Sequence, residues 1–445
     1  MNSNNSGADP GNGFERAIRR GRHRTFLATA ILLATLSPSA FAQSTSDAQS
    51  IRAQIEALRA EQARIAEMQR QTDAKIRSLE AGLNLPSPAP QASPAPAAQV
   101  AAADTPSKLN VTGDLRLRSQ GDYSDEDGRD RRSGQVRGRV GATYSVNDRV
   151  TLGARLVTGD PDDPNSTDVQ MSNFDDDFQV SLDLAYAQIN FGDLNVFGCK
   201  LPQPFARTDL VWDGDVNPQG VSGVYKHKLA NGSSIRASGL FFIVDEDAVA
   251  ADSTMLGGQV GYDSAAFGEW KFDMSGAYYD YTLGSVVGGD TGDFRTNLRN
   301  ADGSYVSDFN LGDLLVGVTW SGLGSRWPVR VLGDYVKNFG AETSADTGYG
   351  VDLGLGRATQ PRDWRVTYGY SAAETDSVLA AFSHDNTGIA TNYRLHALTL
   401  DYMPLPKTLL TAIWYHYKPD NSIDAGSNDV GDWLDRVRIA FLVSF

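Results

Sequence analysis

The sequence predicts an all-β protein, a transmembrane antiparallel β-barrel of about sixteen strands, preceded by an α-helical coiled coil. Three observations support this prediction. Short runs of alternating apolar and polar residues recur from Leu109 to the end, residues 1–42 have the features of a secretory signal, and a seven-residue repeat lies between them. Strands of a membrane barrel turn alternate side chains to lipid and to the interior, so alternation with period two is their expected signature.

Residues 1–42 read as a signal peptide that is removed on export. A cluster of arginines precedes the apolar run Phe26–Leu36, and Ala40-Phe41-Ala42 forms a small-x-small cleavage site. The apolar run is too short to cross a membrane as a helix. The chain carries a formal net charge of −15, which disfavours nucleic acid as a partner. Its single cysteine, Cys199, excludes an intramolecular disulfide framework.

Residues 43–85 predict a coiled coil, because apolar positions recur at alternating offsets of four and three. Its seam comprises Ile51, Ile55, Leu58, Gln62, Ile65, Gln69, Thr72, Ile76, Leu79 and Leu83. We expect association into a homotrimer. A lone amphipathic helix packed on another partner is the alternative. Residues 86–108 are a Pro/Ala-rich linker, which we expect to be extended and semi-rigid.

Residues 109–445 hold the predicted barrel. The last strand shows the pattern well: Val437, Ile439 and Phe441 alternate with polar residues, and the sequence finishes on the aromatic Phe445. Short connections such as 145–148 and 230–233 predict tight turns, whereas 283–307 predicts a long external loop. Short turns at one end and long loops at the other are the outer-membrane layout. An even number of strands places both barrel ends, and the coiled coil, in the periplasm.

Several arginines are expected to point into the barrel if the neighbouring Val and Leu residues face lipid. These candidate pore-lining residues are Arg116, Arg118, Arg137, Arg139, Arg155, Arg436 and Arg438. The first and last strands are neighbours in a closed barrel, so the arginines should form one basic wall. Guanidinium groups stay charged at any working pH. Alternatively, individual arginines serve as structural partners for Asp114 or Asp183.

The segment Pro202–Pro218 is too rich in proline for a strand, and its apolar residues need burial. Folding into the lumen would bury them and form a constriction. The candidate residues are Asp209, Trp212, Asp213 and Asp215, whose carboxylates would face the arginine wall and help to select ions. The alternatives are an external loop packed on its own aromatic residues, or a chance calcium-like pair at 213 and 215.

Five motifs resemble the outer-membrane family described as "putative porin". They are Gly113–Arg118, Arg155–Asp160, Thr208–Asp215, Asp363–Tyr370 and Glu374–Phe382. The resemblance implies a passive diffusion channel of modest size and supplies no substrate. Cys199 departs from the pattern, because we expect a glycine next to a basic residue there without a cysteine. Phosphate-selective porins are a nearby alternative, although their lysine-rich constriction is not evident.

These observations predict an outer-membrane porin of a Gram-negative bacterium, a water-filled channel for passive diffusion of small hydrophilic solutes and ions. The arginine wall and the acidic loop would shape its selectivity. The alternatives are a phosphate- or anion-selective porin, and a structural tether that contacts the cell wall through the coiled coil. We predict no enzymatic activity, since no Ser-His-acid set, metal spacing or nucleotide motif is recognisable. The expected partners are outer-membrane lipid and further copies of the chain, with no cofactor or metal.

Overall fold

The computed structural model describes residues 108–445 except 125–129, 162, 164, 173, 175–176, 250, 285–295 and 422–431. The predicted signal peptide, the coiled coil with its seam, and the linker up to residue 107 lie outside the described residues and stay predictions. Among the described residues, no helix has the length and apolar character needed to cross a membrane.

The described chain is built almost entirely from β-strands. They are β1 (Leu109–Tyr123), β2 (Arg131–Ser145), β3 (Val150–Thr158), β4 (Val169–Gln170), β5 (Val180–Phe191), β6 (Leu194–Lys200), β7 (Gln219–Lys228), β8 (Ser234–Asp245), β9 (Ser253–Asp263), β10 (Trp270–Leu283), β11 (Asn310–Trp320), β12 (Val329–Asn338), β13 (Thr347–Gly356), β14 (Trp364–Ala373), β15 (Tyr393–Tyr402), β16 (Thr408–Pro419) and β17 (Leu434–Ser444). One 3₁₀-helix, η1 (Ala380–Phe382), precedes β15.

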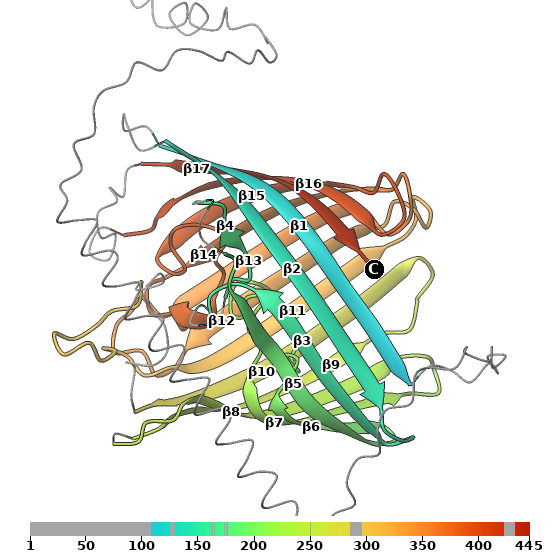
Figure 1. Cartoon of the computed structure of the whole chain (residues 1–445), viewed down its shortest axis with the longest axis horizontal. Coiled ribbons are helices and arrows are strands. Elements are labelled where there is room, and N and C mark those ends of the chain that lie inside the picture. Colours follow the sequence, from blue (N-terminus) through green and yellow to red (C-terminus); the bar gives the residue numbers. More distant parts are fainter. Residues whose placement is uncertain are drawn as a thin grey trace, which may run out of the picture. The chain divides into compact units, whose positions relative to one another are not determined.

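The strands close into a barrel (Figure 1). Seventeen strands form one antiparallel sheet, and β4 is a two-residue strand that pairs with β2 inside a connection, so sixteen strands make the wall. The predicted number of about sixteen is confirmed. Closure comes from pairing of β1 with β17, in register from Asp114 opposite Ser444 to Tyr123 opposite Asp435. Each of the sixteen described wall strands therefore has two neighbours, so the sheet has no free edge strand among them.

The alternation seen in the sequence becomes an apolar outside and a polar inside. Leu115 and Leu117 on β1 are 50% and 47% exposed, whereas Arg116 and Arg118, which alternate with them, are only partly exposed inside the barrel. The outer surface also carries aromatic side chains, including Trp364 and Trp414. A protein in water would bury such a surface, but lipid solvates it, and this explains why so many large apolar residues are exposed.

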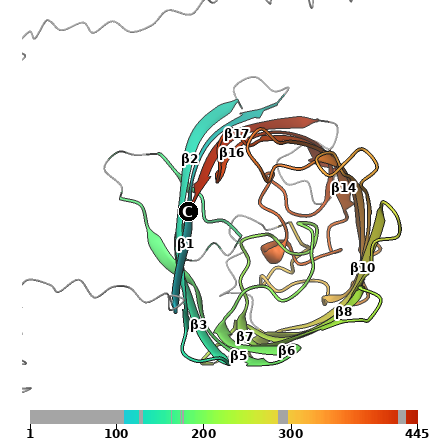
Figure 2. The same cartoon turned by 90° about the vertical axis from the view of Figure 1, so that its right-hand side faces the viewer.

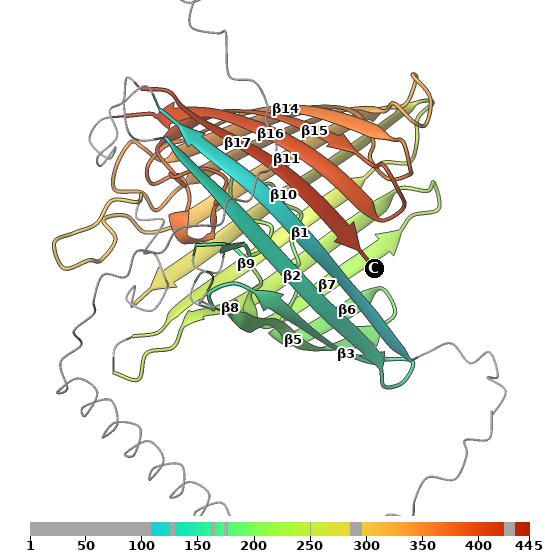
Figure 3. The same cartoon turned by 45° about the horizontal axis from the view of Figure 1, so that its top comes forward.

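The connections divide by length between the two barrel ends (Figure 3). The end that carries Phe445 has short turns, such as 229–233, where Gly232 takes a positive φ of 86°. Glycine suits such a turn because it lacks a Cβ. The other end carries the long connections 159–179, 201–218, 284–309 and 374–392. The predicted tight turns are therefore confirmed. The connection after β10 is long, as expected, but it is not wholly external, because Asn297 is buried and bonds to the connection 374–392.

The main buried apolar cluster lies in the barrel interior. Figure 2 shows green and orange segments, including η1, within the ring of strands. The cluster joins Trp212 and Phe382 from these segments to inward side chains of the wall, such as Phe242, Tyr279 and Tyr281. In this barrel the long loops and the inner wall share one packed core, which narrows the interior on one side.

Candidate functional site in the barrel lumen

The seven predicted arginines lie together on the inner face of β17, β1, β2 and β3, which are consecutive neighbours in the wall. The register explains their proximity. Arg116 lies directly opposite Arg137, and Gln120 lies opposite Arg438. Directly opposed residues on neighbouring strands point to the same face of a sheet. Alternation along each strand therefore carries the set of arginines to the inner face of the barrel.

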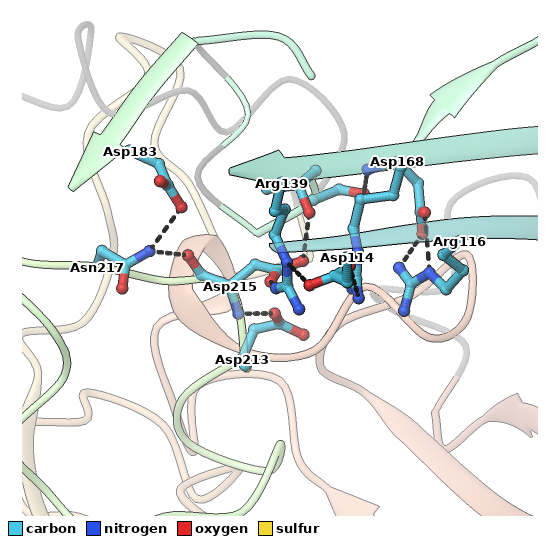
Figure 4. Close-up of polar contacts among 12 residues, drawn as sticks. Asp114, Arg116, Arg139, Asp168, Asp183, Asp213, Asp215 and Asn217 are labelled. Atoms are coloured by element: carbon cyan, nitrogen blue, oxygen red, sulfur yellow. Dashed lines mark hydrogen bonds and ion pairs between the residues drawn. The ribbon is translucent and has the colours of Figure 1, made fainter. Parts of the chain in front are cut away.

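Carboxylates compensate most of this wall (Figure 4). Asp114 forms ion pairs with two arginines: its Oδ1 lies 2.9 Å from Nη2 of Arg137, and its Oδ2 lies 2.8 Å from Nε of Arg139. Asp168 also forms two ion pairs: its Oδ2 lies 2.5 Å from Nη2 of Arg116 and 2.6 Å from Nη1 of Arg118. Its side chain is almost fully buried between the two guanidinium groups. Charge-assisted contacts of this kind are short and directional, so they fix the arginines in place.

The remaining three arginines are also held. Arg155 pairs with Asp183, and Arg436 pairs with Asp122 at 2.5 Å. Arg438 has polar partners without a carboxylate: it donates to Oε1 of Gln120 at 2.8 Å and to Oδ1 of Asn386 at 3.2 Å. Six of the seven arginines therefore have a carboxylate partner among the described residues, and the wall presents far less net positive charge than the arginines alone would suggest.

Loop 202–218 enters the barrel and is anchored there by its apolar residues. Trp212 is fully buried, and Phe205 and Leu210 are nearly so. The Trp212 ring packs edge-on against Tyr279, with centroids 5.5 Å apart, and stacks on Phe382 at 5.6 Å. The apolar residues in the sequence of this loop predict that it is buried. The loop does not pack outside the barrel on its own aromatic residues, which was the alternative.

The acidic residues of this loop diverge, which corrects the expectation that all three face the arginines. Asp215 contacts Nη1 of Arg139 at 3.2 Å and accepts from Thr167 at 3.0 Å. Asp213 instead accepts from the backbone N–H of Asp215 at 2.7 Å. Asp209 accepts from the amide of Asn386 at 3.0 Å. Burial, followed by the nearby carboxylates of the loops, raises the pKa of Asp213 well above its usual value.

The Asp213 and Asp215 carboxylates do not form a calcium-like pair, because one binds backbone and the other binds Arg139. More broadly, no group of three or more His, Cys, Asp or Glu side chains in the described ranges is arranged to hold a metal ion.

A second loop, 374–392, also folds into the lumen, and the sequence reasoning did not predict it. The backbone N–H of Asp213 donates to the carbonyl of Phe382 at 2.8 Å, which joins the two loops. The amide of Asn297 donates to the carbonyls of Thr375 at 2.7 Å and Val378 at 2.9 Å. An available signal was the apolar run Val378–Phe382 inside a connection, the same signal that identified loop 202–218.

A cavity of about 350 Å³ lies between these two loops and the inner face of β12–β16. Its charged lining residues are Arg207, Asp209, Asp334 and Asp352. None of the three acids forms an ion pair with another described residue: Asp209 meets Asn386, Asp334 accepts from Thr208, and Asp352 is exposed with no polar contact among the described residues. Paired arginines and unpaired acids thus occupy different parts of the lumen.

Residues 123–296 match the family model described as "Putative porin", which confirms the resemblance seen in the motifs. The barrel is similar to Pseudomonas putida OprB at high pH, with TM-score 0.52 and 10% identity, over 76% of this chain and 94% of that chain. It is also similar to Salmonella typhi OmpF in complex with daunomycin, with TM-score 0.48 and 11% identity, over 76% and 97%. A comparison with curated protein sequences finds no match. The family match and the barrel fold support an outer-membrane porin channel.

Proposed function

We propose that the protein is a porin with a narrowed lumen, through which small hydrophilic solutes and ions diffuse passively. The observation that carries the proposal is a closed barrel whose apolar face points outward and whose charged side chains, including Asp352, are exposed inside. Such a wall gives water and ions a path that lipid cannot enter. Family and fold both favour a channel over an enzyme.

The two inner loops favour a small pore. Loops 202–218 and 374–392 pack together inside the barrel through Trp212 and Phe382. Their shared apolar contacts stabilise the inward position by burying aromatic surface, roughly 25 cal/mol for each Å² removed from water. A solute therefore has to pass beside this core instead of through the full width of the barrel.

We further propose that the pore prefers cations. The arginine wall is compensated by Asp114, Asp168, Asp183, Asp122 and Asp215, so its field on a passing ion is weak. Asp352 is exposed in the lumen and has no cationic partner among the described residues. Unpaired charges on a pore wall decide which ions pass. This arrangement argues against the phosphate- or anion-selective alternative.

Trimer formation remains part of the proposal, as does the periplasmic coiled coil that would support it. Light scattering of the purified full mature chain in detergent tests the oligomeric state directly. If the protein has a monomeric mass and full conductance, the trimer proposal is wrong and the channel proposal stands.

The test of the channel is single-channel recording in a planar bilayer, with the reversal potential measured under a potassium chloride gradient. We expect stepwise conductance and a reversal potential of cation-selective sign. Asp352→Asn should reduce that preference. Asp263→Asn is a matched control, because Asp263 is a lumen-facing acid of β9 that does not line the cavity. An anion-selective potential would overturn the selectivity proposal, and folded protein without conductance would overturn the porin proposal.

A further inference from the structure

The cavity between the two inner loops has features of a binding site as well as of a passage. Its volume of about 350 Å³ falls in the range of small-molecule sites, roughly 300–1,000 Å³. Three small residues of the wall, Gly350, Gly369 and Ala397, line it and leave the space open. A Cβ added at Gly369 would lie 2.5 Å from Oδ1 of Asp352, so this glycine also leaves room for the carboxylate.

The lining carries more negative than positive groups. Asp209, Asp334 and Asp352 line it together with one cationic residue, Arg207, one of whose donors is occupied by the carbonyl of Gly214 at 2.9 Å. Asp334 is buried and accepts from the hydroxyl of Thr208. A protonated amine would find several acceptors here, of which Asp209 and Asp352 are exposed.

His384 supplies an independent indication of a ligand. The residue is 2% exposed and lines the cavity, and its Nε2 has no hydrogen-bond partner among the described residues. Nδ1 of the same ring accepts from the backbone N–H of Asn386 at 3.2 Å. A neutral imidazole with Nδ1 as acceptor carries its proton on Nε2. The unsatisfied group is therefore a donor, which requires an acceptor oxygen, and burying it without one is unfavourable.

Aromatic side chains complete the site. The rings of Tyr393 and Tyr415 are buried in the cavity lining. Tyrosine rings offer an apolar face and attract cations through their quadrupole. A ligand with a flat or ring-shaped apolar face, one cationic group and at least one oxygen acceptor satisfies every group named above.

We propose that this cavity binds small organic cations that also carry hydroxyl or carbonyl oxygens, of the class represented by protonated amino sugars and amino alcohols. Asp352 and Asp209 would receive the ammonium group, and His384 Nε2–H would donate to an oxygen of the same solute. This inference rests on the proposed channel function and makes the pore a selective one for such solutes.

The test uses folded full mature protein and four ring-shaped probes: glucosamine at mildly acidic pH, glucose, glucuronate and cyclohexylamine. Isothermal titration calorimetry gives binding in detergent without requiring conductance, and current block in a planar bilayer reports binding inside an open pore. We expect glucosamine to bind roughly tenfold more tightly than glucose, and glucuronate not to bind. Glucosamine should also bind more tightly than cyclohexylamine, which has the charge but no acceptor.

Asp352→Asn should weaken glucosamine binding about tenfold and leave glucose binding unchanged, whereas Asp352→Glu should restore most of it. Asp263→Asn, the lumen acid remote from the cavity, should bind like the wild type. Conducting protein that binds glucosamine no better than glucose would overturn this inference while the porin proposal stands. Equal binding of cyclohexylamine and glucosamine would overturn the role of His384. Absence of conductance would instead count against the porin proposal itself.

Discussion

Cys199 has a backbone conformation that suits glycine better than cysteine. Its φ is +81°, and it pairs across β6 and β7 with Gly220, whose φ is +143°. A Cβ in the left-handed region costs roughly 1–2 kcal/mol, and the extra freedom of glycine in the unfolded chain offsets roughly 0.5–1 kcal/mol of that. The cysteine at this position, where the family resemblance leads us to expect none, therefore strains the barrel wall locally.

We expect Cys199→Gly to raise the free energy of unfolding by up to about 1 kcal/mol, because it removes the Cβ. Cys199→Ala keeps the Cβ and should leave stability nearly unchanged. Urea unfolding of the barrel in detergent measures both. Equal stabilisation by the two variants would mean that the thiol, and not the backbone conformation, is responsible.

His384 makes loop 374–392 sensitive to acid. Burial, with Arg438 and Arg436 nearby, lowers its pKa from the usual 6.5 to about 3. A histidine with a depressed folded pKa favours the folded state fully above pH 6.5, and this contribution is lost as the pH falls from 6.5 towards 3, at about 1.4 kcal/mol per pH unit. Burial raises the pKa of Asp213, so this residue acts in the opposite direction and favours the folded state as the pH falls.

Replacing His384 by Gln should therefore flatten the loss of stability between pH 6.5 and 3. The contribution of Asp213 is common to both proteins, so it cancels in the comparison. Stability measured by urea unfolding at several pH values checks this expectation. Parallel pH profiles for wild type and variant would show that the ring is not buried as described.

At the scale of single elements, Trp212 is the main anchor of loop 202–218. Its ring contacts Tyr279, Tyr281 and Phe382, so it links the loop to β10 and to η1. We expect Trp212→Ala to cost roughly 3–5 kcal/mol. Because the wall strands are stabilised by their own ladders, the barrel should persist while the loop leaves its inward position.

The measurement for Trp212→Ala is single-channel conductance beside thermal stability. Conductance should increase, because the loop no longer narrows the lumen. Trp212→Phe keeps most of the ring contact and serves as the control. A destabilised Trp212→Ala barrel with unchanged conductance would contradict the idea that this loop limits the pore.

Sequence alone predicted the strands and the burial of loop 202–218, but it did not predict the polar contacts that the loops make, for a physical reason. Each strand carries its own signal, since lipid on one face and water on the other impose period-two alternation over neighbouring residues. Loop contacts carry no such local signal. The partner of Arg116 is Asp168, 52 residues away, and one of the two partners of Arg139 is Asp215, 76 residues away. The arginines could therefore be placed on one wall, while their neutralisation by carboxylates became visible only in three dimensions.

At the scale of the whole molecule, the barrel is a unit that begins after the predicted coiled coil, at about Ala102. A chain that starts there should fold and conduct like the full mature chain, because every wall strand and both inner loops are retained. Loss of the heptad seam should reduce only the stability of the oligomer. Conductance together with light scattering tests this expectation. Loss of conductance on truncation would favour a role for the coiled coil in the channel or as a tether.

The pairing of β1 with β17 joins residues more than 300 positions apart: Arg436 meets Asp122 and Arg438 meets Gln120. A slip of two residues that placed Arg438 opposite Arg118 would set two like charges side by side in the lumen. Replacing Arg438 by Gln should therefore slow the appearance of correctly closed barrel in a refolding time course, if these charges guide closure. The residues that line the folded channel would then also act during folding, because they would disfavour barrels in which the first and last strands pair in the wrong register.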